Sequence, residues 1–151
     1  MSAGQQQLQA LSQELQEIQG TIETLQTTVE GIRQDQREID DAVEAIENLE
    51  SDSVVQVPLG GGAYVRATVD DIDELIVELG ADYAAEFERD RAVETLENKR
   101  ARLDDRIDEV TERISELEAE STQLEQQAQQ IQQQALQQQM QGMQGQGDRD
   151  E

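Results

Sequence analysis

The chain has 151 residues, a formal net charge of -24 and an aromatic content of only 2%. Such a low aromatic content argues against a large globular core, because Phe, Tyr and Trp usually dominate core burial. The absence of Cys and His excludes disulfides, zinc-thiolate sites and imidazole bases, and the acidity disfavours nucleic-acid binding.

Neither a signal peptide nor a membrane span is predicted. No apolar stretch at the N-terminus resembles a signal peptide, and no run approaches the roughly 20 apolar residues that a membrane-spanning helix needs. We therefore expect a cytoplasmic protein.

The acidity comes with an almost complete lack of lysine. Asp and Glu outnumber Lys and Arg by 35 to 11, and Lys99 is the only lysine. This composition indicates adaptation to multimolar salt, where the Debye length falls to about 3 Å at 1 M and charge repulsion is screened. The alternative is an acidic coiled coil without salt adaptation.

A long helix is predicted for about residues 5–50. Its apolar residues step by three and four in alternation, which is the a/d pattern of a coiled coil. Gln36 interrupts the pattern at an a position, where a lone polar residue more often sets register than binds a ligand. The apolar positions are Leu8, Leu11, Leu15, Ile18, Ile22, Leu25, Val29, Ile32, Ile39, Val43 and Ile46.

Residues 54–88 are predicted to form two β-hairpins that serve assembly. The first turns at a glycine triplet, Gly60 to Gly62, which supplies the positive φ angles of a tight turn. Pro58 cannot donate to a strand ladder, so its strand keeps an open edge that invites pairing with another chain. The residues expected to carry assembly alternate along the strands: Val55, Val57, Leu59, Val65, Val69, Leu75, Val77, Leu79, Tyr83 and Phe87.

The second hairpin, Leu75 to Phe87, rests on a weaker pattern. Its residues alternate in hydrophobicity, but Ala and Glu are weak strand formers, so a helix is the alternative. The acidic stretch from Asp70 to Asp73 is predicted to be a polar turn or a single helical turn.

A return helix is predicted for residues 90–140, again with an a/d pattern. If it folds back on the first helix, Leu8, Leu11 and Leu15 must face the small residues Ala128 and Ala135. These leucines would then be incompletely covered. The Gln-rich sequence beyond Ile131 indicates either a solvated end or an adaptable contact surface dotted with Met, and residues 141–151 are expected to form a flexible tail.

No constellation in the sequence supports catalysis, and we expect no cofactor and no metal. The glycine triplet lacks the Gly-Lys-Ser/Thr of a phosphate loop. Asp70, Asp71 and Asp73 lack the glycine and the terminal glutamate of a calcium loop. Glu116 and Glu120 lie one helical turn apart on an exposed face, whereas general acid-base work needs a desolvated carboxyl group.

The order of helix, two central hairpins and return helix resembles the alpha-type subunit of archaeal prefoldin. The most specific portion is VPLGGGAYV, residues 57–65, followed by LIVELGADYAAEF, residues 75–87. Two hairpins rather than one point to the alpha class. The sequence departs from the commoner pattern in its acidity and its long glutamine tail.

The resemblance implies a mainly α fold with a small β part, which is a long antiparallel coiled-coil hairpin whose two central β-hairpins form an oligomeric β-barrel. It implies a hexamer of two alpha-type and four beta-type subunits, which binds unfolded proteins without ATP and passes them to a group II chaperonin. We hypothesise that Leu8, Leu11, Leu136, Met140 and Met143 contact clients. The alternative function is a non-enzymatic coiled-coil scaffold or spacer.

Overall fold

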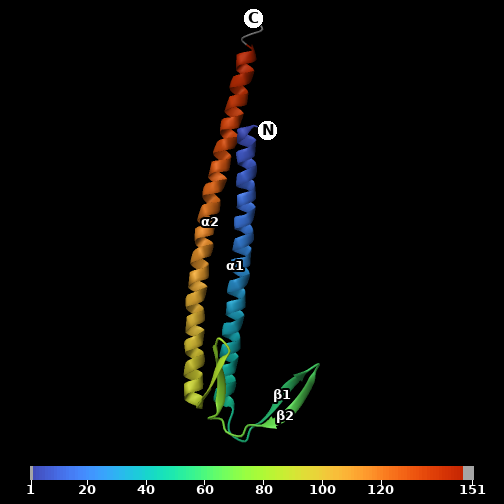
Figure 1. Ribbon diagram of the computed structural model, residues 1–151, viewed down its shortest axis with the longest axis vertical. Helices are drawn as coiled ribbons and strands as arrows, with labels where there is room; N and C mark the ends of the chain where they lie inside the picture. The colour runs from blue at the N-terminus through green and yellow to red at the C-terminus, as the bar shows by residue number, and fades with distance from the viewer. Residues whose placement is uncertain (1, 148–151) are drawn as a thin grey trace. The chain divides into compact units, whose positions relative to one another are not determined.

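The computed structural model describes residues 2–147, with side chains from residue 2 to residue 142. Its elements are α1 (Ala3–Asn48), β1 (Val54–Gly60), β2 (Ala63–Thr68), β3 (Leu75–Gly80), β4 (Tyr83–Phe87) and α2 (Arg89–Gly147). Figure 1 shows them and labels the two helices and the first hairpin. Both predicted helices and both predicted hairpins are confirmed.

The main difference from prediction lies at the end of α2. This helix continues to Gly147, past residue 140 where the sequence prediction ended it. Gln and Met favour the helix and no proline interrupts the segment, so the helix continues although Gly142 and Gly145 each cost about 1 kcal/mol of helix propensity. Of the predicted tail, residues 148–151 lie outside the described part of the chain.

The fold divides into two compact units. One contains the chain up to Val29 and from Asp108 onward, and the other contains Glu30–Ile107. Each unit holds a section of both helices, and the second unit also holds the four strands.

In the first unit the two helix sections pack antiparallel along their a/d positions. Ile18 and Ile22 form a buried cluster with Leu117, around which Leu25, Ile114 and Leu124 are partly buried. Nearer the start of α1, the Cα of Gly4 faces Ile131, because a Cβ on Gly4 would lie 4.0 Å from its Cγ2 atom. The contacts therefore run in opposite directions along the two helices, as expected if the return helix folds back on the first.

In the second unit one hairpin completes the helix core. Ile39 of α1 packs with Ala92 and Leu96 of α2, and Val77 of β3 is buried in the same cluster. Leu75 and Phe87 are packed against this cluster from the two paired strands. The β3–β4 hairpin thus covers the helix pair with one face, as a half-buried strand pair does.

The two hairpins are separate two-stranded sheets with the same turn design. Each has a register irregularity before the turn, at Pro58/Gly60 and at Glu78/Gly80. Each then closes through two residues at positive φ, Gly61 and Gly62 in the first hairpin and Ala81 and Asp82 in the second. Positive φ at both turn residues matches the right-handed twist of the strands.

Short polar contacts join the strands to the helices. Asp71 forms a turn by accepting a hydrogen bond from the N–H of Asp73 at 2.9 Å, where the sequence had allowed one helical turn. The Asp73 carboxylate accepts from the N–H of Arg89 at 3.3 Å, at the first residue of α2. Lys99 of α2 donates from Nζ to the carbonyl oxygen of Glu78 in β3 at 3.4 Å.

Candidate functional site

The two hairpins have the same register and the same turn design, but they differ in sequence and in what covers them. Val57 lies opposite Val65 in the first hairpin, and Val77 lies opposite Ala85 in the second. Val77 is only 6% exposed, because it packs against the helix pair, whereas Val57 is 40% exposed. The β1–β2 hairpin therefore presents an apolar face that the described residues of the chain leave largely uncovered.

The residues predicted for assembly fall into three groups: core, exposed and partly buried. Leu75, Val77 and Phe87 belong to the core of the second unit, so they serve the fold of the chain itself. Val57, Leu59 and Val65 in the first hairpin, and Leu79 and Tyr83 in the second, are exposed. Partial burial applies to Val55 and Val69.

Leu59 and Val69 depart from the simple alternation that the sequence suggested. Leu59 lies at the register irregularity and has no partner in the ladder. Val69 follows the last residue of β2, where its N–H donates to the carbonyl oxygen of Ser53 at 2.8 Å. Both effects arise from the bulge and the strand ends, which a strict period of two does not anticipate.

Sequence reasoning missed three large apolar side chains that the strands expose. Ile76 is 75% exposed, and Val54 and Tyr64 are similarly open. All three point to the other face of their strand than the residues predicted for assembly. Ile76, for example, lies between Leu75 and Val77. A sequence signal was present, because successive side chains of a strand point to opposite faces and these three apolar residues lie on the face assigned to solvent.

The ends of the helices in the first unit form open grooves. Leu8, Leu15 and Ala128 line a groove of about 340 Å³ together with Gln9, Ser12 and Gln132. A second groove of about 340 Å³ is lined by Ser2, Gly4, Gln5, Leu8, Ala135, Gln138 and Gln139. The predicted meeting of large leucines with small alanines is thus found, and it leaves the leucines incompletely covered.

Of the predicted client residues, Leu8 lines both grooves, whereas Leu11, Leu136 and Met140 line neither. Leu8 and Leu11 are half-buried, whereas Leu136 is 59% exposed and Met140 is 65% exposed. The side chain of Met143 lies outside the described part of the chain. We call the two grooves, together with Leu136 and Met140, the helix-end surface.

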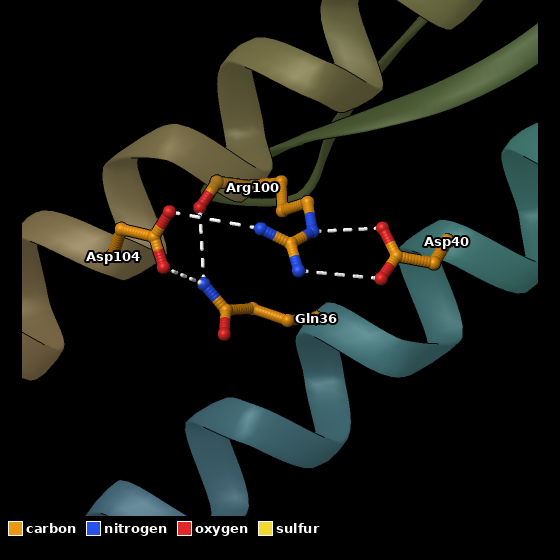
Figure 2. Close-up of polar contacts among 4 residues, drawn as sticks. All are labelled: Gln36, Asp40, Arg100 and Asp104. Carbon is orange, nitrogen blue, oxygen red and sulfur yellow. Dashed lines mark hydrogen bonds and ion pairs between the residues drawn. The ribbon is translucent and has the colours of Figure 1, made fainter.

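A polar cluster interrupts the apolar contact between the helices in the second unit (Figure 2). Gln36 is buried and donates from Nε2 to Asp104 Oδ1 at 2.6 Å and to the Arg100 carbonyl oxygen at 3.3 Å. Arg100 donates from Nε and Nη2 to both oxygens of Asp40, at 2.7 and 3.3 Å. This hydrogen bond and the charge of Asp40 raise the pKa of Arg100 above its ordinary value. The cluster holds charged hydrogen bonds between the helices, which supports the register role expected for Gln36.

The described residues were also compared with the requirements of metal sites and membrane spans. Among residues 2–147, no group of three or more His, Cys, Asp or Glu side chains is arranged to hold a metal ion. Neither long helix has an apolar stretch able to cross a membrane, as far as the described residues extend.

Comparison with known proteins finds relatives that cover most of the chain. The family model for the prefoldin subunit matches residues 18–134. Prefoldin subunit alpha of Halorubrum lacusprofundi is 66% identical over 109 residues, which cover 72% of each chain. Prefoldin subunit alpha of Haloarcula marismortui is 58% identical over 104 residues, 69% of this chain and 68% of the relative.

Solved structures agree with the fold. A cryo-EM structure of filamentous PFD from Methanocaldococcus jannaschii aligns with a TM-score of 0.53 at 24% identity, covering 79% of this chain and 95% of that one. The crystal structure of the prefoldin beta subunit from Thermococcus strain KS-1 aligns with a TM-score of 0.53 at 20% identity, covering 82% and 90%. The chain therefore belongs to the prefoldin family, in its alpha-subunit class.

Proposed function

We propose that the chain is a subunit of an ATP-independent holdase, which binds unfolded polypeptides at the helix-end surface. The observation that carries this proposal is the exposure of Leu136 and Met140 on the part of α2 whose residues Ala135 and Gln139 line an open groove. Flexible Met and Leu side chains adapt to varied apolar partners. Membership of a chaperone family supports the same role.

Assembly through the strands is the second part of the proposal. The uncovered apolar face of β1–β2, with Val57 opposite Val65, has the character of a joint between subunits. Two-stranded sheets keep open edges, and closing them into a barrel with neighbouring hairpins satisfies these edges. We place two alpha-type and four beta-type chains in such a hexamer, by analogy with the family.

Several helix ends acting on one client would turn weak contacts into useful avidity. A holdase of this kind lowers the concentration of free unfolded chains by binding them. Delivery to a group II chaperonin in the cytosol, without nucleotide or other cofactor, completes the proposed function.

Removal of the helix ends tests client binding. Deleting residues 1–11 and 132–151 should leave the size of the complex with a beta-type subunit unchanged, because the core of the second unit and the strands are retained. Suppression of the aggregation of an unrelated unfolded protein should be lost. A truncated complex that still suppresses aggregation would contradict the proposal, and a passive spacer would show no suppression even before truncation.

A milder variant keeps both helices at full length. We expect Leu136→Gln with Met140→Gln to weaken aggregation suppression several-fold, because both side chains are exposed and contribute apolar area to clients. The matched control is Ser115→Gln with Ala119→Gln, two exposed positions on the same helix. Suppression assays in molar KCl compare the two variants, and equal activities would argue against the helix-end surface.

A further inference from the structure

The helix-end surface has no ionisable side chain. Residues 2–13 and 126–147 contain no Asp, Glu, Lys or Arg, although charged residues make up 30% of the chain and its net charge is -24. The first charged residue on α1 is Glu14, and the last one before the neutral part of α2 is Glu125. Asp148 follows outside the described residues. An unusually acidic chain thus keeps both helix ends neutral.

Amide side chains replace the charges around the grooves. Leu8 and Ala128 give the first groove apolar lining, and Gln9 and Gln132 give it polar lining. We call the glutamines that line a groove its rim. In the second groove the rim includes Gln5, Gln138 and Gln139. Each glutamine offers one acceptor oxygen and two N–H donors, whereas a carboxylate offers acceptors only.

We propose that the helix-end surface selects uncharged, extended polypeptide segments. This inference rests on the proposed function and names the class of client that the same site takes. Apolar side chains of such a segment enter the grooves, and its backbone N–H and C=O groups bond to the glutamine amides. An unfolded backbone needs both donors and acceptors, which the glutamine rim supplies together.

Binding of charged segments is disfavoured, because the neutral rim offers them no charged partner. A charged side chain loses hydration when it is covered, and it recovers that loss only against an opposite charge. No charged side chain lines either groove, and residues 2–13 and 126–147 contain none. Binding that relies on neutral groups is also unaffected by screening, which removes charge-based contacts when the Debye length is about 3 Å at 1 M salt.

The test uses the full-length chain assembled with a beta-type subunit and three blocked peptides. The peptides share the same Leu and Val residues, which are spaced by Ser and Gln, by Glu, or by Lys, and each carries a neutral fluorophore. Fluorescence anisotropy gives Kd for each peptide in about 1 M and about 3 M KCl. We expect the neutral peptide to bind at least about tenfold more tightly than either charged peptide, and its Kd to change less than about threefold between the two salt concentrations.

Charge placed on the groove rims gives the decisive comparison. The variant Gln132→Glu with Gln138→Glu should weaken binding of the neutral peptide about tenfold and make binding of the Lys-spaced peptide depend on salt. The control is Gln130→Glu with Gln137→Glu, at exposed positions that line neither groove. The control should change Kd less than about twofold, and circular dichroism checks that both variants remain helical.

The outcomes separate this inference from the function on which it rests. Equal affinity for all three peptides, or an unchanged Kd in the groove variant, overturns selection by charge while leaving holdase activity intact. If the native complex binds none of the peptides and fails to suppress aggregation, the holdase function is overturned, and the inference falls with it.

Discussion

At the scale of single residues, the same side chain has two environments in this chain. Val77 in the second hairpin is enclosed by Ile39, Ala92 and Leu96. Val57, at the equivalent place in the first hairpin, is much more exposed than Val77. The first valine stabilises the chain itself, and the second is free to stabilise an assembly.

Aspartate at these two positions should therefore have different effects. We expect Val77→Asp to lower the free energy of unfolding by about 3 kcal/mol, because it places a carboxyl group in an apolar core. Val57→Asp should change the stability of the isolated chain by less than about 1 kcal/mol but should disperse the assembly, more fully when combined with Val65→Asp. Urea unfolding and sedimentation in molar KCl measure the two effects. Equal destabilisation by both substitutions would contradict the distinction.

The buried amide of Gln36 should lower the free energy of unfolding and at the same time fix a unique register between the helices. We expect Gln36→Leu to raise the free energy of unfolding by about 1 kcal/mol, because a buried polar group is replaced by apolar packing. Distances between spin labels at positions 38 and 102 should become more broadly distributed. Asp41→Leu, at an exposed position of α1, is the control. A narrow distribution in Gln36→Leu would show that other contacts fix the register.

Arg100 should contribute equally to stability across the neutral pH range. Its pKa is raised in the folded chain by Asp40, so this stabilisation is fully present below the ordinary pKa of arginine and is lost only at still more alkaline pH. The difference in unfolding free energy between the native chain and Arg100→Met should be the same at about pH 6 and about pH 9. A difference that varies between these values would assign the pH dependence to another group.

At the scale of elements, the hairpin turns use the same backbone conformation with different residues. Gly61 has φ 61° and Ala81 has φ 51°. Glycine reaches this region without steric strain, whereas alanine does so at a cost of roughly 1 kcal/mol. The second turn is therefore the more strained of the two.

Substitutions at these two turn positions should change the stability of the chain in opposite directions. Gly61→Ala should raise strain in the first turn by about 1 kcal/mol, since nothing lies within 4 Å of the added Cβ and only the φ angle matters. Ala81→Asn should relieve strain in the second turn by roughly 0.5 kcal/mol, because asparagine tolerates positive φ. Thermal unfolding in molar KCl measures both changes. Destabilisation of equal size in both variants would exclude this account of the turns.

The sequence predicted the elements well because their signals are local. The a/d positions from Leu8 to Ile46 follow the helix period directly, and the glycine triplet marks the first turn. The covering of one hairpin by the helices was not predictable, because Val57 and Val77 both lie on the alternating apolar face of a strand and nothing local distinguishes which face is covered. The difference depends on Ala92 and Leu96, which are distant in sequence from the first hairpin and become neighbours of Val77 only after folding.

The region of the predicted client residues was also predictable only where the signal is local in the sequence. The large leucines opposite small alanines could be read from the a/d pattern, and the grooves around Leu8 follow from that mismatch. The glutamine rims were not predicted as part of a site, because which glutamines border a groove depends on how the two helices pair.

At the scale of the whole molecule, the net charge of -24 sets the conditions in which the chain folds. The four ion pairs found among the described residues involve Arg33, Arg100 and Arg113, and they leave most carboxylates without a basic partner. Repulsion between these carboxylates opposes the compact state unless salt screens it.

We expect helicity and assembly to decrease as KCl falls from molar to millimolar concentrations. Circular dichroism and light scattering measure the two properties. A neutral osmolyte at the same osmolarity is the control, because it does not screen charge and should not restore helicity. Unchanged dichroism over the whole range would exclude salt adaptation.

The contact between Lys99 and the carbonyl oxygen of Glu78 gives direct experimental access to this fold. Lys99 is the only lysine side chain, so an amine-reactive dye applied after blocking of the N-terminal amine attaches at one defined place, between α2 and β3. Its emission would then report, in real time, whether the second hairpin is docked on the helices or has separated from them.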